Sequence, residues 1–343
     1  MQLLKYFAWR NWALFEYNSC TENIFAFFYL ALVGGSWGPA FIFSFFVFYF
    51  FSALATSYGY LVNDLGDREL DRRHNKPNVF EKDSIFCAIT VVGLFLLGAV
   101  LLSLYFRKNH PFVALWLLWI LIATFYSLPP FRLKEKGKIG LLLIVTAQRL
   151  IPALLIFSVF GKMASADAVI IILYIMNRGF ISDLRHQLED LEHDLSTGTR
   201  TFAAENREQA GIFFKCLLKI DLLLQGMVHL ACLFTMPRIS MHGFSIPVTL
   251  PVFLVFVLGV VVLFLKHGTG SNGDPYYDTG LRNFLHLGIP SFYFPLYLLI
   301  VLVLYSPLML TVLVFFLLLH RIFSPDRIRR SLPARIITAL CRR

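Results

Sequence analysis

The sequence predicts an all-α integral membrane protein, and three observations lead to this fold class. Hydrophobic residues make up 57% of the 343 residues, charged residues make up 15%, and the mean hydropathy is +0.68, so the chain is more apolar than a water-soluble domain. Apolar runs close to the roughly 20 residues that cross a hydrocarbon core recur along the chain. Helices are expected in these runs because lipid cannot satisfy the backbone groups of an open sheet edge.

Nine apolar runs are long enough to be interpreted as spans. In chain order they cover residues 22–36, 39–62, 84–106, 111–128, 140–160, 166–182, 211–235, 246–265 and 291–320. We therefore expect about nine transmembrane helices in a single polytopic domain over residues 1–343, with a basic C-terminal tail at 321–343. The five cysteines show no CxxC or paired spacing, so neither a disulfide framework nor a zinc site is expected.

The connections between the spans form two alternating sets. The short ones are 36–38, 107–110, 161–165 and 236–245, and the long ones are 63–83, 129–139, 183–210 and 266–290. With the flanking residues Arg178 and Lys162 counted, the long set carries fifteen Lys and Arg residues and the short set four. The positive-inside rule then places the long connections in the cytoplasm. The net charge of +10 is thus a sign of topology and not of nucleic-acid binding.

The arginine-rich tail conflicts with this topology, because nine spans with the N-terminus inside would place residues 321–343 outside. Pro295 and Pro307 interrupt the last apolar stretch, so that stretch could double back. Otherwise the tail would lie on the membrane surface as a basic amphipathic segment.

An acidic motif follows the second span. Asn63, Asp67 and Asp71 are spaced by four, so they share one helical face, whereas Asp64 points off it. Clustered carboxylates repel one another unless a cation neutralises them, and hard oxygen ligands suit Mg²⁺. The alternative is a solvated loop whose acids pair with the neighbouring cations Arg68, Arg72, Arg73 and Lys76.

A second acidic motif lies between the sixth and seventh spans. Its polar stripe, spaced by four, three and four, consists of Asp183, Gln187, Asp190 and Asp194, and Gly198 is placed to stop the helix. A charged interfacial helix is the alternative, and His186 with His193 could form a transition-metal site. Two carboxylate stripes on one side of a bundle can clamp a diphosphate through bridging Mg²⁺ ions.

A basic loop lies between the fourth and fifth spans. Pro129 and Pro130 end a helix there, and Arg132 and Lys134 follow as cations suited to diphosphate oxygens. Lys136 and Lys138 are interpreted as topological charges. Intramembrane charges normally mark function. Examples in this chain are Arg149, Asp221, Lys215 and Lys219, of which the two lysines can snorkel to the cytoplasmic edge.

Taken in order, these motifs resemble the UbiA superfamily of intramembrane prenyltransferases. The matching patterns are NDxxDxxxD from Asn63 to Asp71, YSxPPxRxK from Tyr126 to Lys134, and DxxxD at Asp190 and Asp194 with a trailing GxxT. The resemblance implies a ring of nine helices around a central cavity, a cytoplasmic cap of loops that carries the acidic motifs, and a lateral opening to lipid.

The resemblance also implies roles for particular residues. Asp67, Asp71, Asp190 and Asp194 would be catalytic and, with Asn63, would bind Mg²⁺, the expected cofactor. Asn63, Tyr126, Arg132 and Lys134 would bind the diphosphate. Further candidates are Asp64, Arg72, Arg149, Asp183 and Gln187.

The expected function is Mg²⁺-dependent transfer of a prenyl group from an isoprenyl diphosphate to an aromatic or other lipophilic acceptor. The expected setting is the lipid bilayer, with no nucleic acid and no obligatory protein partner. A membrane terpene cyclase would use the same metal motifs, and a polyprenyl-phosphate sugar transferase is a second variant. A transporter is the alternative from another class, but its acids would lie near mid-membrane. Here the acids gather at helix ends.

Overall fold

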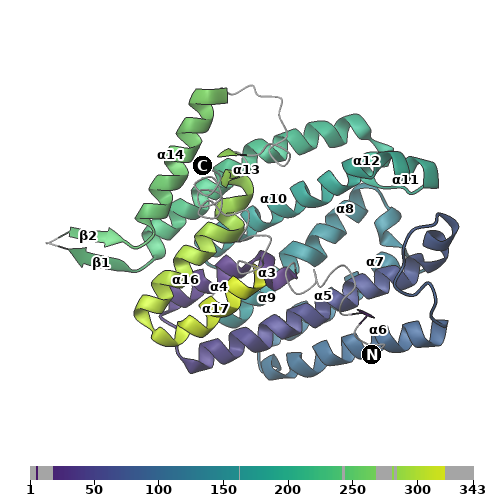
Figure 1. Ribbon diagram of the computed structural model, residues 1–343, viewed down its shortest axis with the longest axis horizontal. Helices are drawn as coiled ribbons and strands as arrows, with labels where there is room; N and C mark the ends of the chain where they lie inside the picture. The colour runs from purple at the N-terminus through teal and green to yellow at the C-terminus, as the bar shows by residue number, and fades with distance from the viewer. Residues whose placement is uncertain are drawn as a thin grey trace, which may run out of the picture.

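The computed structural model describes residues 5–6, 18–161, 163–241, 244–267, 280–281 and 284–320, and these form a bundle of long helices (Figure 1). Six helical stretches are long and apolar enough to cross a membrane. They are Pro39–Arg73, Ile85–Phe106, His110–Ser127, Lys138–Phe160, Arg207–Thr235 and Phe284–Tyr305. Three shorter apolar helices accompany them, at Ile24–Gly34, Leu250–Leu265 and Pro307–Leu319.

The N-terminal part is built on phenylalanine packing. Its elements are α3 (Ser19–Glu22), α4 (Ile24–Gly34), α5 (Pro39–Arg73), α6 (Ile85–Ser103), η2 (Leu104–Phe106) and α7 (His110–Ser127). Gly35, at a φ of 62°, ends α4, and Pro39 begins α5. The ring of Phe27 makes edge-to-face contacts with Phe45, Phe48 and Phe160. These contacts join α4, α5 and the fifth predicted span.

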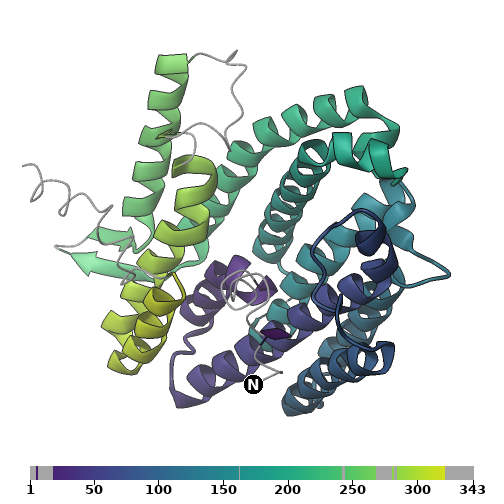
Figure 2. The same cartoon turned by 45° about the vertical axis from the view of Figure 1, so that its right-hand side comes forward.

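The middle part is centred on a pair of long helices. Its elements are η3 (Leu133–Glu135), α8 (Lys138–Val145), the π-helical turn η4 (Thr146–Leu150), α9 (Ile151–Phe160), α10 (Ala166–Glu189), α11 (Leu191–Thr197), α12 (Phe202–Glu205) and α13 (Arg207–Thr235). Helices α10 and α13 lie side by side (Figure 2). Helices α8 and α9 form one continuous stretch through η4, as Thr146–Leu150 keep helical geometry with wider hydrogen bonding.

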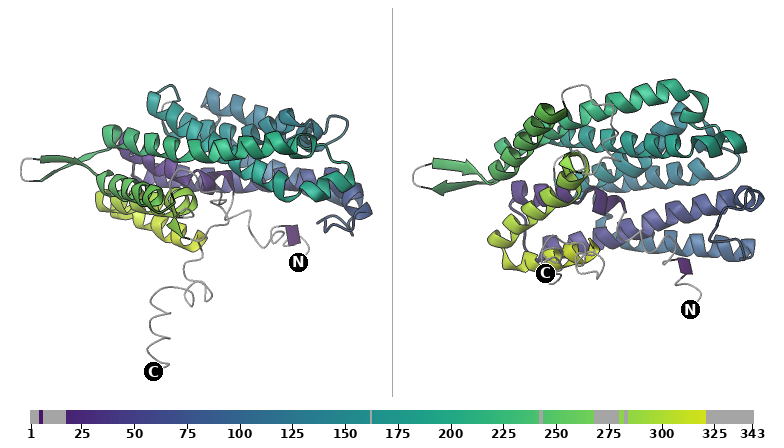
Figure 3. Two further views of the ribbon diagram at one scale, coloured as in Figure 1. Left: turned by 90° about the horizontal axis from the view of Figure 1, so that it is seen from above. Right: turned by 45° about the horizontal axis from the view of Figure 1, so that its top comes forward.

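The C-terminal part combines a small hairpin with broken helices. Strands β1 (Arg238–Met241) and β2 (Phe244–Pro247) pair antiparallel, with Ile239 opposite Ile246. The hairpin projects from the end of the bundle opposite to α11 (Figures 1 and 3). The remaining elements are α14 (Leu250–His267), the π-helix η5 (Phe284–Tyr293), α16 (Phe294–Tyr305), η6 (Pro307–Met309) and α17 (Leu310–Leu319).

Each predicted span overlaps helix, but four differ from the prediction. The eighth, 246–265, begins in strand β2, and its helix α14 starts only at Leu250 and is one of the shorter apolar helices. The first is only 11 residues long, as α4. Residues 166–182 belong to α10, a 24-residue helix that is not among the six apolar spans. The stretch 291–320 is not one helix, because Ser306 is extended and Pro307 starts a new turn. The ring of His320 lies 5.2 Å from that of Phe292, so α17 folds back along α16.

The first apolar helix of the described chain touches the last two, since Phe28 on α4 also lies 6.3 Å from Phe316 on α17 between ring centroids. Helix α4 packs against α16, and Phe25 lies 6.0 Å from Phe294 between ring centroids. The chain therefore closes on itself. The predicted tail at 321–343 and part of the connection 266–290 lie outside the described residues.

Candidate active site

The first acidic motif lies on the last turns of α5. This helix is 35 residues long and continues beyond its apolar part to Arg73, so Asn63, Asp67 and Asp71 share one helical face, as their spacing predicted. Gly66 lies at the closest approach to α7: a Cβ at this position would come within 2.6 Å of the Ser127 carbonyl oxygen. A glycine in the motif therefore allows the acidic helix end to contact the start of the basic loop.

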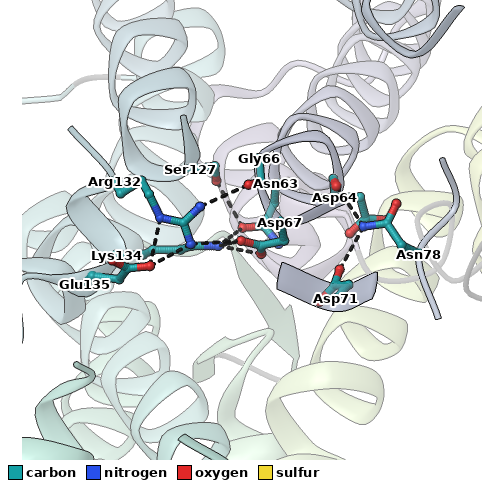
Figure 4. A network of polar contacts seen from close by, with 10 residues as sticks. All are labelled: Asn63, Asp64, Gly66, Asp67, Asp71, Asn78, Ser127, Arg132, Lys134 and Glu135. Carbon is teal, nitrogen blue, oxygen red and sulfur yellow. Dashed lines mark hydrogen bonds and ion pairs between the residues drawn. The ribbon is translucent and has the colours of Figure 1, made fainter. Parts of the chain in front are cut away.

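The basic loop places two cations on Asp67 (Figure 4). Lys134 Nζ donates to both Asp67 carboxylate oxygens at 2.5 Å, and Arg132 Nη2 donates to Oδ1 at 3.1 Å. Arg132 also donates to the Gly66 carbonyl oxygen at 3.0 Å and to Glu135 at 2.8 Å. The two predicted diphosphate-binding cations thus neutralise the central carboxylate of the first motif.

The two cations differ in their electrostatics. Burial lowers the pKa of the Lys134 ammonium below its ordinary value, although the adjacent Asp67 carboxylate opposes the shift. Burial also acts to lower the pKa of Arg132, but Glu135 and Asp67 outweigh it and the pKa is raised. Arg132 is therefore a permanent cation, and the buried Lys134 gains more from an additional anion in the site.

Asn78 completes the first motif and was not predicted from the sequence. Its Nδ2 donates to the Asp71 carboxylate at 2.8 Å and to the Asp64 carbonyl oxygen at 2.7 Å. The amide therefore ties the segment after α5 back onto the helix. Residue 78 lies in a turn after Pro77, off any helical stripe, so no spacing pattern marked it.

The second acidic motif is divided between two helices and a loop. Helix α10 ends at Glu189, Asp190 follows as its cap, and α11 stops at Gly198, which has a φ of 70°. The predicted stripe is therefore broken at Asp190, while the predicted stop at Gly198 is present. The Thr201 hydroxyl donates to Asp194 at 2.9 Å, and the backbone N–H of Gly137 donates to the Arg200 carbonyl oxygen at 3.3 Å. The last contact joins the second motif to the basic loop.

Both motifs and the basic loop line one cavity of about 250 Å³. Of the predicted site residues, it is lined by Asp67, Asp71, Tyr126, Arg132, Lys134, Asp183, Gln187, Asp190 and Asp194. A second cavity, of about 480 Å³, shares Tyr126, Lys134 and Asp190 with the first. Its other lining residues include Asn63, Trp119 and Ala147. A polar chamber thus adjoins a larger chamber that has more apolar walls and extends toward the middle of the bundle.

Three of the further candidates lie outside these two cavities. Asp64 is 5% exposed and belongs to another face of α5. Arg72 is exposed and pairs with Glu69 at 2.8 Å. The Arg149 side chain packs against Gly179 on α10. Conversely, His186 lines both cavities and Thr199 lines the first, although neither was among the predicted site residues.

The donor set around the first cavity fits Mg²⁺. Asp67, Asp71, Asp190 and Asp194 all supply hard oxygen ligands to one small chamber. Within the described residues, no three His, Cys, Asp or Glu side chains are already gathered into a metal cage. Mg²⁺ does not need such a cage, because it commonly uses one or two carboxylates together with water and substrate phosphates. Lys134 occupies the position beside Asp67 that a metal cation could take.

Comparison with known proteins identifies the fold. A UbiA homolog from Archaeoglobus fulgidus bound to DMAPP and Mg²⁺ is 17% identical, with a TM-score of 0.54 over 88% of this chain and 99% of that chain. The same homolog bound to GPP and Mg²⁺ is 18% identical, with the same TM-score and coverage. A digeranylgeranylglyceryl phosphate synthase is 17% identical, with a TM-score of 0.55 over 87% of this chain and 98% of that one.

These likenesses define the class: a membrane-embedded helical bundle of the UbiA type. The model of the UbiA prenyltransferase family matches residues 23–288, which is more than half of the chain. The chain therefore belongs to the UbiA prenyltransferase family. No curated protein matches the sequence significantly.

Proposed function

We propose that this protein is a Mg²⁺-dependent intramembrane prenyltransferase that moves a prenyl group from an isoprenyl diphosphate to an aromatic or other lipophilic acceptor. One observation carries this proposal. Four aspartates from α5 and from the α10–α11 junction meet two cations around one polar cavity, and that cavity adjoins a larger, less polar one. A diphosphate attached to an isoprenoid chain has the same division into a charged head and an apolar tail.

The diphosphate group binds in the polar cavity. Arg132 and Lys134 already reach into it from the basic loop, and Tyr126 lies at the boundary with the second cavity. Because a diphosphate carries more charge than the Asp67 carboxylate, it competes with Asp67 for Lys134. Substrate binding therefore releases part of the Asp67 pairing and makes that carboxylate available to a metal ion.

Asp67, Asp71, Asp190 and Asp194, with Asn63, are the residues that would hold Mg²⁺. When bound, Mg²⁺ neutralises the negative charge that develops on the leaving diphosphate. Asn63 Oδ1 accepts hydrogen bonds from Ser127 and from Lys134, each at 3.1 Å, so its position is fixed between α5 and the basic loop.

The isoprenoid chain lies in the second cavity, where Tyr60, Trp119 and Tyr126 are among the lining residues. The bond between the allylic carbon and the diphosphate oxygen breaks, and its electron pair leaves with the diphosphate. Aromatic faces stabilise the allylic cation, and apolar walls exclude water. A new bond then forms from the acceptor to the allylic carbon, and the acceptor loses a proton.

The fold supports a cytoplasmic position for the acidic end of the bundle. His320 Nε2 lies 3.3 Å from the Ser291 carbonyl oxygen, so α17 returns along α16 to η5. This is the doubling back that the prolines of the last apolar stretch made possible. It supports our proposal, based on the positive-inside rule, that the long basic connections face the cytoplasm.

The test is to incubate the purified protein in lipid nanodiscs with Mg²⁺, labelled prenyl diphosphates of several lengths and a panel of lipophilic acceptors. Prenylated acceptor should form only when Mg²⁺ is present. Products formed with no acceptor added would identify a cyclase, and an absence of any turnover across the panel would contradict the proposal.

A further inference from the structure

A third, much smaller cavity adjoins the second one on the side away from the acidic motifs. It measures about 20 Å³, and its walls include Phe48, Ser52, Trp116 and Pro152. Two residues line both the second and the third cavity, Thr56 and Trp119. The three cavities therefore form a row, which is interrupted at the level of Trp119, where it runs between α5, α7 and the α8–α9 stretch.

The Trp119 indole crosses this row. It extends from α7, and its Nε1 donates to the Ala147 carbonyl oxygen on η4 at 2.7 Å. On the α5 side, its Cη2 atom would lie 3.6 Å from a Cβ built on Gly59, so the ring covers the helix surface at that glycine. Below it, the ring stacks on Trp116 at 5.2 Å between centroids. One side chain thus bridges all three walls.

The local sequence explains why the Ala147 carbonyl is available to Trp119. In the π-helical turn η4, the Ile151 N–H donates to the Thr146 carbonyl oxygen, five residues back. The same pattern would pair the Ala147 carbonyl with residue 152, but Pro152 has no N–H. A buried carbonyl requires another donor, and the indole N–H supplies it. Pro152 therefore fixes the indole across the row.

We infer that Trp119 is the floor of the isoprenoid pocket and that it limits the preferred prenyl diphosphate to about ten carbons. This inference rests on the proposed function. From Asn63 to Thr56 the second cavity follows α5 for about 10 Å, at about 1.5 Å of rise per residue. An extended isoprene unit has four chain bonds of about 1.5 Å and spans about 5 Å. Two units fill the depth above the indole.

Removing the indole should join the second and third cavities. The third cavity itself adds only about 20 Å³, so most of the new space is the volume that the indole occupied. The Trp119→Ala variant is therefore expected to accept about one further isoprene unit. The expected change is in chain-length preference and not in diphosphate or metal binding.

The experiment measures Mg²⁺-dependent binding of prenyl S-thiolodiphosphates with ten, fifteen and twenty carbons to the full-length protein in nanodiscs. These analogues keep the diphosphate but do not react, so no acceptor is needed. The original protein should bind the ten-carbon analogue at least about tenfold more tightly than the fifteen-carbon one. Trp119→Ala should abolish or reverse this preference, whereas Trp119→Phe, which keeps most of the ring surface, should retain much of it.

Trp116→Ala is the matched control. Trp116 stacks beneath the floor and lines only the third of these cavities, so its removal leaves the Trp119 to Ala147 hydrogen bond in place. The chain-length preference of the Trp116→Ala variant should match that of the original protein. If Trp119→Ala does not fold, Ala123→Leu tests the same pocket from above, because Ala123 lines the second cavity one turn along α7. That variant should weaken binding of the ten-carbon analogue relative to a five-carbon one.

The outcomes are distinguishable. If the original protein and Trp119→Ala have equal chain-length preferences, the inference that Trp119 limits the chain length is wrong, while the proposed function remains intact. A length preference unchanged in Ala123→Leu would overturn it equally. If no analogue of any length binds the original protein with Mg²⁺, the proposed function itself fails.

Discussion

Two groups of polar side chains in this bundle pair an aspartate with a basic residue, and they differ in what surrounds the pair. At the end of α5, Asp67 faces an open cavity and is contacted by both Lys134 and Arg132. Within the bundle, Asp221 on α13 is 2% exposed, and its Oδ2 lies 2.6 Å from Nδ1 of His286 on η5.

The surroundings indicate different roles for the two pairs. Around Asp67 there are more cations than one carboxylate requires, together with space for a ligand, so the pairing can be exchanged. Asp221 is enclosed, and Asn177 on α10 also donates to it, at 3.4 Å. A buried pair of this kind joins α10, α13 and η5, because neither partner has water as an alternative. Intramembrane charge alone therefore does not distinguish the two pairs. The adjoining cavity does, and it supports Asp67 as part of the proposed active site.

The largest expected effect is the loss of turnover when carboxylates that line the first cavity are removed. Asp67→Ala and Asp190→Ala should each reduce kcat/KM by at least about a thousandfold, because charge on the leaving diphosphate is no longer neutralised. Both variants should keep the thermal unfolding midpoint close to that of the original protein. Glu69→Ala is the control, since Glu69 pairs with Arg72 at the surface of the same helix. Full activity in both aspartate variants would refute the site assignment.

Substitutions in the enclosed pair of Asp221 and His286 should instead change the stability of the protein. His286→Leu leaves the buried Asp221 carboxylate without its short hydrogen bond and should lower the free energy of unfolding by about 3 kcal/mol or more. The double variant Asp221→Leu with His286→Leu should recover most of that loss, since an apolar pair replaces a polar one. Denaturation in detergent micelles measures both values. A double variant no more stable than the single one would show that the pair does not act as a unit.

Helical spacing predicted the parts of the site that lie within one element. Asn63, Asp67 and Asp71 share a face of α5 because their separation of four residues is local information. The second stripe was predicted less well, because α10 ends before Asp190 and the chain turns there. The spacing of the acidic residues alone does not predict that turn.

Contacts between distant segments could not be predicted from spacing. His286 is 65 residues from Asp221, and Trp119 is 28 residues from its partner Ala147. Asn78 binds Asp71 only because the chain folds back after α5. In each case the partner is chosen by packing among helices, and the residue types alone are common in membrane proteins. Asp221 was recognised as an intramembrane charge. Its burial, which distinguishes it from the residues of the proposed active site, could be seen only in the fold.

A smaller effect is expected from the lysine that links the carboxylate to the substrate. Lys134→Met should raise KM for the prenyl diphosphate by about tenfold or more, the value of one charge-assisted hydrogen bond. Lys136→Met is a matched control in the same loop, because Lys136 is exposed and lies outside both cavities. Steady-state kinetics at saturating Mg²⁺ separate KM from kcat. Equal KM values in the two variants would mean that the loop acts through its net charge and not through Lys134.

The smallest effect should come from a hydroxyl that positions one carboxylate. Thr201 donates to Asp194 at 2.9 Å and also accepts from the Ala204 N–H at 3.3 Å, so it orients Asp194 while capping α12. Thr201→Val keeps the shape but removes both contacts, and it should raise the Mg²⁺ concentration for half-maximal activity by several-fold, up to about tenfold. Thr201→Ser retains the hydroxyl and should restore the original value. If the valine variant keeps the original value and the serine variant loses it, the methyl group and not the hydrogen bond positions Asp194.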